Sequence, residues 1–147
     1  MSHELWRAIE QPGPTDGVLL EWARRVGAAY EGLRPFLKPT GQFARSYPHP
    51  DPARPSMKVC LCPDGTYRAV CRDGTTPPHQ LRRSDLALYV FDFERLRAVL
   101  IKAMKLVAAN DPLHITDLTL PIGACRIGKR RVPVMLLRSR HRVDHDL

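Results

Sequence analysis

The fold of this chain is decided between residues 57 and 72, which read MKVCLCPDGTYRAVCR. Two runs rich in apolar and β-branched residues flank a Pro-Asp-Gly sequence at residues 63–65. Such runs favour extended strands, and Asp-Gly between them is a strong local signal for a tight turn. The sequence therefore predicts an antiparallel β-hairpin that turns at Asp64 and Gly65.

The register of this hairpin determines where its cysteines lie. The hairpin cysteines are Cys60, Cys62 and Cys71. A two-residue turn at Asp64 and Gly65 would place all three on one face, because alternate residues of a strand point the same way. A three-residue loop over residues 63–65 would shift the register by one and turn Cys71 to the other face.

In the first register, the cysteines could form a zinc site. Three thiolates on one face, with Cys125 or His79 as the fourth ligand, would suit tetrahedral zinc. Zinc ribbons, however, carry two Cys-x-x-Cys pairs, and this chain has Cys-x-Cys and single cysteines. We therefore expect no cofactor and buried thiols, with zinc held by Cys60, Cys62, Cys71 and Cys125 as the alternative. A ribbon that keeps its hairpin without metal fits the same residues.

Two helices are predicted ahead of the hairpin. A short one spans His3 to about Glu10, and a second begins with Thr15 or Asp16 as its N-cap. It stops near Arg34, because the residue before Pro35 is disfavoured in helical geometry. Apolar residues of the second helix recur at helical spacing and form one stripe, namely Leu19, Trp22, Val26, Ala29 or Tyr30, and Leu33.

Residues 35–56 contain six prolines, including an alternating run over residues 48–52. This composition favours extended polyproline II structure, so the segment is interpreted as a connector. The alternative is that it wraps over the core through its apolar side chains, which are Phe36, Leu37, Phe43 and Tyr47.

A core helix and a second hairpin are predicted after the first. Residues 86–91 are apolar throughout and suit either a buried strand or the first turns of a helix. Asp92 is a good N-cap for a helix that continues to Asn110. The expected apolar stripe of that helix is Phe93, Leu96, Leu100, Ala103 or Met104, and Val107. Short strands are then expected at Thr116–Leu120, Ala124–Ile127 and Val132–Arg138, with a turn at Gly128-Lys129.

The predicted fold class is therefore α+β, with N-terminal helices, a Pro-rich connector and two antiparallel β-hairpins flanking a central amphipathic helix. The predicted segments are a helical part at 1–34, the connector at 35–56, an α+β core at 57–142 and a flexible tail at 143–147. At 147 residues, one compact domain is the default.

Charge indicates the class of partner. The chain has 23 Lys and Arg against 15 Asp and Glu, and 18 of the 23 cations are arginines. The resulting net charge of +8 and pI near 9.8 favour polyanions. No run of about 18 uncharged apolar residues and no signal-peptide pattern is present, so we expect a cytoplasmic protein without a membrane partner.

The second hairpin is the candidate binding element. Residues 121–142 contain seven Lys or Arg and no acidic residue. Four of the cations lie round the turn, and three extend the charge toward the C-terminus: Arg126, Lys129, Arg130, Arg131, Arg138, Arg140 and Arg142. A basic two-stranded ribbon can follow a phosphate backbone or enter a groove. Alternatively, the cations are solvated and protect a sheet edge from aggregation.

Catalytic motifs are not recognisable in the sequence, so we expect a protein that is not an enzyme. Two weaker arrangements are a Cys71–His79 nucleophile–base pair and metal ligands among residues 141–146. The charge pattern favours a nucleic-acid-binding protein, with duplex DNA preferred over RNA because aromatic-rich RNA-binding signatures are missing. The alternative is a small adaptor or inhibitor that docks on an acidic surface, which the Pro-rich segment at 35–55 favours.

Overall fold

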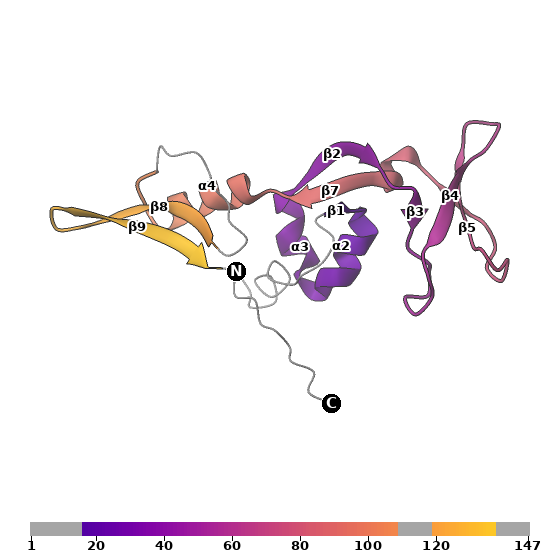
Figure 1. Ribbon diagram of the computed structural model, residues 1–147, viewed down its shortest axis with the longest axis horizontal. Coiled ribbons are helices and arrows are strands. Elements are labelled where there is room, and N and C mark those ends of the chain that lie inside the picture. Colours follow the sequence, from indigo (N-terminus) through magenta and orange to yellow (C-terminus); the bar gives the residue numbers. More distant parts are fainter. Residues whose placement is uncertain (1–15, 109–118, 138–147) are drawn as a thin grey trace, which may run out of the picture. The chain divides into compact units, whose positions relative to one another are not determined.

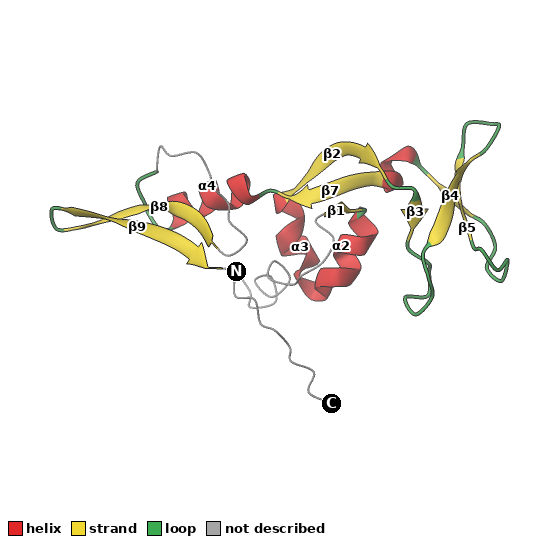
Figure 2. Ribbon diagram, in the orientation of Figure 1, coloured by secondary structure: helices red, strands yellow, loops and turns green. Residues whose placement is uncertain are grey.

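The computed structural model describes residues 16–108 and 119–137, and contacts divide the chain into two units, Met1–Phe91 and Asp92–Leu147 (Figure 1). The α+β class is confirmed, because the described strands form three antiparallel sheets accompanied by a few helices (Figure 2). The predicted helix over residues 3–10 lies outside the described residues. No helix in the described ranges is long and apolar enough to cross a membrane.

The first unit carries two of the sheets, with strand orders β1-β7-β2 and β3-β4-β5-β6. Its elements are β1 (Asp16–Gly17), α2 (Leu19–Val26), α3 (Tyr30–Leu33), β2 (Leu37–Phe43), β3 (Ser46–Tyr47), β4 (Met57–Leu61), β5 (Tyr67–Val70), β6 (His79–Leu81) and β7 (Ala87–Phe91). The second unit contains α4 (Phe93–Ala103), β8 (Thr119–Ile127) and β9 (Arg130–Leu137).

The second predicted helix is divided in two and begins later than expected. Asp16 pairs with Val90 in a sheet, so it cannot cap a helix. The N-cap is Val18, whose N–H donates to Glu21 Oε2 at 3.0 Å. Gly27 ends α2 at a φ of 54°, a conformation that costs a glycine little.

The predicted apolar stripe is nevertheless confirmed as core except at Leu19, which is only partly buried. Trp22, Val26, Ala29 and Leu33 form one buried cluster, against which residues of β2 and β7 pack. The Trp22 indole N–H also donates to the carbonyl of Tyr89 at 3.0 Å. The two helices thus cover one face of the β1-β7-β2 sheet (Figure 1).

The interpretation of residues 35–56 as a connector was wrong for its first half, because β2 pairs with β7 and β3 pairs with β4. Extended backbone needs little change to join a sheet, and Leu37 gains burial opposite Phe91. Pro39 is tolerated because β2 is an edge strand, where a missing N–H costs least. Of the two structures considered for residues 86–91, the strand is observed, at the centre of its sheet.

The β4–β5 hairpin is confirmed, with the three-residue loop. Cys60 lies opposite Arg68, and the Cys62 N–H donates to the Thr66 carbonyl at 2.8 Å. Gly65, at φ 79°, donates its N–H to the Cys62 carbonyl at 2.9 Å. This pattern is a turn closed by a glycine bulge, and it shifts the register by one residue from a two-residue turn.

Helix α4 begins as predicted but ends early. The Asp92 carboxylate accepts the Arg95 N–H, and Leu96 is fully buried. The helix stops at Ala103, and Val107 instead bridges to Ala124 in β8. The assignment of Met104 and Val107 to a buried helical stripe was therefore wrong, because their side chains are 53% and 50% exposed.

Strand β8 is one element, where two short strands were predicted. The two predicted strands are joined through a register shift between Pro121 and Gly123, which is a β-bulge within a continuous strand. Residues 116–118 of the predicted first strand lie outside the described residues. The partner strand β9 begins two residues before the predicted Val132.

Candidate nucleic-acid interface

The turn of the second hairpin lies where the sequence predicted it. Ile127 pairs with Arg130, which leaves Gly128 and Lys129 as the two turn residues. Gly128 has a φ of 62°, which is readily adopted by glycine at the first central position of a hairpin turn. The pair before the turn is Arg126 opposite Arg131.

All four predicted cations at this turn are exposed to solvent. They are Arg126, Lys129, Arg130 and Arg131. Residues 119–137 contain no acidic side chain, so the local charge is not neutralised within the hairpin. Among the described residues, Arg126, Lys129 and Arg130 form no hydrogen bond or ion pair through their side chains. The three further cations, Arg138, Arg140 and Arg142, lie outside the described residues.

Arg131 differs from the other three because its side chain is held in place. Its Nη2 atom donates to the backbone carbonyl of Ala108 at 3.0 Å. A guanidinium has five N–H donors, so this contact leaves most of them for another acceptor. Arg131 is therefore partly ordered before any ligand arrives.

The hairpin is fixed to α4 and the segment after it by hydrogen bonds to the backbone of β8. Val107 and Ala124 exchange two hydrogen bonds, of 2.8 and 2.9 Å. The Arg97 Nε atom donates to the Ile122 carbonyl at 3.1 Å. Ile122 and Ala124 are buried, whereas Val107 is half-exposed, so these contacts lie at the edge of the buried part of the second unit. The basic turn thus extends from a packed base.

The same contacts explain why Pro133 can lie in β9. The backbone N–H and C=O of Ala124 both bond to Val107, away from β9. Ala124 lies opposite Pro133, so this pair exchanges no hydrogen bonds. The missing proline N–H would have pointed outward, where β9 has no neighbour in the two-stranded sheet.

The cysteines are not brought together as the two-residue turn required. In the observed register Cys71 turns to the face opposite Cys60 and Cys62, and Cys125 belongs to the other unit. Within the described ranges, no three His, Cys, Asp or Glu side chains are grouped so as to hold a metal. All four cysteines are free thiols with partial exposure.

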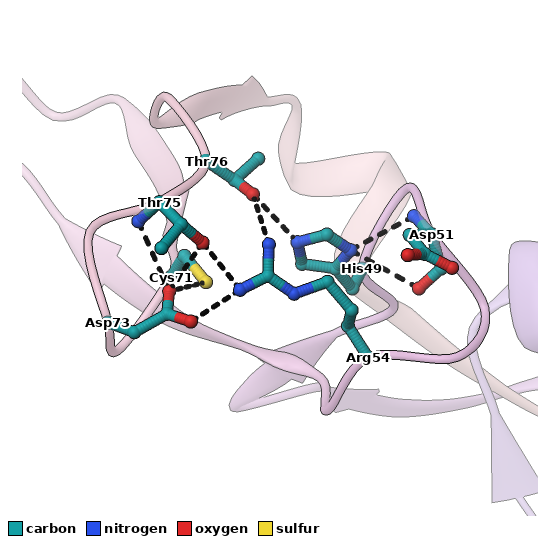
Figure 3. A network of polar contacts seen from close by, with 7 residues as sticks. All are labelled: His49, Asp51, Arg54, Cys71, Asp73, Thr75 and Thr76. Atoms are coloured by element: carbon teal, nitrogen blue, oxygen red, sulfur yellow. Dashed lines mark hydrogen bonds and ion pairs between the residues drawn. The ribbon is translucent and has the colours of Figure 1, made fainter.

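A second polar site, which the sequence did not predict, lies in the first unit (Figure 3). Its members are His49, Asp51, Arg54, Cys71, Asp73, Thr75 and Thr76. Arg54 binds Asp73 and Thr75 through Nη2, and Thr76 through Nη1 at 3.3 Å. The network holds the loop that follows β3 against the loop that follows β5.

His49 is the buried member of this network, at 4% exposure. The Asp51 N–H donates to its Nδ1 atom at 2.9 Å, which favours the tautomer with hydrogen on Nε2. That nitrogen lies 2.9 Å from the hydroxyl of Thr76. From α2, Arg24 donates to the carbonyls of His49 and Pro50 at 2.7 and 3.2 Å. The imidazole is thus hydrogen-bonded on both sides, as a structural histidine is.

Asp73 is the charged acceptor of the network. The Cys71 thiol donates to its Oδ1 atom at 2.8 Å, and so does the Thr75 hydroxyl, also at 2.8 Å. These hydrogen bonds, the thiol first, hold the pKa of Asp73 well below its ordinary value. The Cys71 thiol thus donates a hydrogen bond to a carboxylate. The His79 ring stacks instead on the ring of Tyr47, with ring centroids 6.4 Å apart.

One sequence signal could have revealed this part of the network. The tripeptide Asp-Gly-Thr occurs at residues 64–66 and again at 73–75. At both places the aspartate accepts the backbone N–H and the hydroxyl of the threonine two residues later. The glycines have φ values of 79° and 68°. The repeat therefore encodes the same Asx-type turn twice.

Comparisons with family models, with curated proteins and with solved structures find no match to this chain.

Proposed function

We propose that this protein binds nucleic acid without catalysing a reaction, and that the basic turn of the β8–β9 hairpin contacts the phosphate backbone of duplex DNA. The observation that carries the proposal is a set of four exposed cations at a turn whose strands contain no acidic residue. Three of the four have no partner among the described residues, so they keep their full charge for a ligand.

The shape of the element supports a backbone ligand. A two-stranded ribbon is narrow enough for a DNA groove, and its charge can track successive phosphates. Three of the four cations are arginines, whose planar guanidinium binds phosphate through two parallel hydrogen bonds. The exposed Ile127 beside the turn, at 65%, adds apolar surface that can contact sugars and bases.

The alternative of an adaptor that docks on an acidic protein was favoured by the Pro-rich segment at 35–55. That segment contributes β2 and β3 to the sheets of the first unit, and Arg24 and Thr76 bind its later residue His49. Little of it is left as an unattached extended ligand. Docking on an acidic protein therefore remains as one outcome of the binding test.

The test measures binding of the full chain to a fluorescent duplex of about 20 base pairs over a range of salt concentrations. Each phosphate that the protein neutralises contributes about 0.9 to the slope of log affinity against log salt. Changing Lys129, Arg130 and Arg131 together to Gln should reduce that slope by about 2 to 3 and weaken binding to unrelated duplexes alike.

A matched control separates local charge from total charge. Lys58, Arg72 and Arg82 are exposed cations of the first unit, and changing them to Gln removes the same three charges. This control should keep the slope nearly unchanged, and circular dichroism should show that both variants are folded. An equal reduction of the salt slope in the two variants would overturn the hairpin as the interface. No DNA binding by the unmodified protein at about 50 mM salt, with capture of an acidic protein instead, would overturn the proposal.

A further inference from the structure

Arg126 and Arg131 occupy a special position in the hairpin ladder. Both backbone groups of Ala124 face Val107, and backbone groups alternate sides along a strand. Cys125 therefore faces β9, and Arg126 faces away from it again. The Arg126–Arg131 pair is consequently a non-hydrogen-bonded pair, in which directly opposite side chains come closest, with Cβ atoms about 4.5 to 5.5 Å apart.

Two like charges placed directly opposite each other destabilise a hairpin unless an anion lies between them. Residues 119–137 provide no carboxylate for that role. The repulsion between the two guanidinium groups would be weakest if both side chains could move apart. The hydrogen bond to the Ala108 carbonyl, however, holds the Arg131 side chain in place. Among the described residues no carboxylate pairs with either arginine, so the arrangement is suited to an external anion.

Lys129 and Arg130 are placed differently. Lys129 is a turn residue, and Arg130 lies opposite Ile127 on the other face of the ladder. Their side chains start from different faces or from the turn, so they do not converge on one point as a directly opposite pair does. They provide an internal comparison with the same number of charges.

We propose that Arg126 and Arg131 together clamp a single backbone phosphate, while Lys129 and Arg130 at the turn contact phosphates separately. The inference rests on the proposed function and names the anion-binding pair within it. Guanidinium groups offer several N–H donors each, and phosphate has enough acceptor oxygens for both. Prior ordering of Arg131 lowers the entropy lost when the phosphate binds.

The experiment compares four Gln variants in the duplex-DNA assay, namely Arg126→Gln, Arg131→Gln, the Arg126/Arg131 double variant and a Lys129/Arg130 double variant. Gln removes the positive charge and keeps a polar side chain at each residue. If Arg126 and Arg131 share one phosphate, their double variant lowers the log–log slope by about 0.9. The Lys129/Arg130 double variant removes two separate contacts and lowers it by about 1.8.

The affinities give an independent readout. If the two arginines share one phosphate, their contributions to the affinity are coupled. The fold-loss of affinity in the Arg126/Arg131 double variant should then differ at least threefold from the product of the fold-losses in the two single variants. A slope reduction of about 1.8 with multiplying losses, or an unchanged affinity, would overturn the clamp while the unmodified protein still binds DNA. If the unmodified protein does not bind duplex DNA, or binds only anionic lipid vesicles, both the clamp and the proposed function are overturned.

Discussion

Gly123 lies where β8 packs against the segment that follows α4, and its replacement tests how the hairpin is anchored. A Cβ atom at this position would lie 2.8 Å from the Val107 carbonyl oxygen and 3.4 Å from Leu106 Cβ. That carbonyl accepts the N–H of the next residue in β8, Ala124, at 2.9 Å. Gly123→Ala therefore pushes against a backbone atom that cannot rotate away.

The expected magnitude follows from the two hydrogen bonds at risk. Each of the bonds between Val107 and Ala124 is worth about 0.5 to 1.5 kcal/mol, so losing both costs about 1 to 3 kcal/mol. The φ of Gly123 lies outside the left-handed region, so alanine is allowed there and recovers about 0.4 to 1 kcal/mol through the unfolded chain. The free energy of unfolding should fall by about 1.5 kcal/mol.

Urea unfolding of the full chain measures this change, and hydrogen exchange at the amides of Val107 and Ala124 locates it. Gly32→Ala is the control, because Gly32 lies in α3 and no atom beyond its chain neighbours and its own helix backbone lies within 4 Å of the place where the added methyl group would be. That control should raise the free energy of unfolding by about 0.5 to 1 kcal/mol. The reasoning is refuted if Gly123→Ala is as stable as the unmodified protein, or if exchange at both amides is unchanged.

Two further predictions concern the core and the polar network. Leu96→Ala should lower the free energy of unfolding by about 2 to 5 kcal/mol, because Leu96 is fully buried, whereas Met104→Ala, at a half-exposed position, should cost under about 1 kcal/mol in the same urea assay. Asp73→Asn should lower the thermal midpoint at neutral pH, because the ionised carboxylate is the form that Cys71 and Thr75 stabilise. Since the folded-state pKa of Asp73 is depressed, its contribution is present above the ordinary carboxyl pKa near 4 and is lost as the pH falls below it, so the two melting curves should converge in acid. A constant difference between them down to about pH 2 would contradict this assignment.

The sequence predicted those parts of the candidate site that depend on neighbouring residues, namely the position of the turn and the cations around it. Gly128-Lys129 is a turn signal, and cations without acidic neighbours are visible in the sequence itself. What the sequence could not show is which cations face each other. The pairing of Arg126 with Arg131, and the contact of Arg131 with Ala108, depend on a register and on a segment distant along the chain.

The polar network was missed for a related reason. His49 and Arg54 lie in a segment whose prolines suggested a connector, and their partners Thr76 and Asp73 are 27 and 19 residues away in the sequence. Side-chain pairing at that distance leaves no periodic pattern. Only the repeated Asp-Gly-Thr turn depends on residues close enough in the sequence to be predicted from it.

The sequence by itself determined the features that depend on neighbours within a few residues: the Asp92 cap, the stripe through Trp22, and the two hairpins. Tertiary structure decided the rest. The observed β4–β5 register buries Met57 and Ala69 against Leu81 and Leu86. Helix α4 ended at Ala103 because Val107 gains two hydrogen bonds and a strand partner in β8. Helical propensity near the end of a helix is worth only tenths of a kcal/mol per residue, so a pairing worth about 1 kcal/mol or more overrides it.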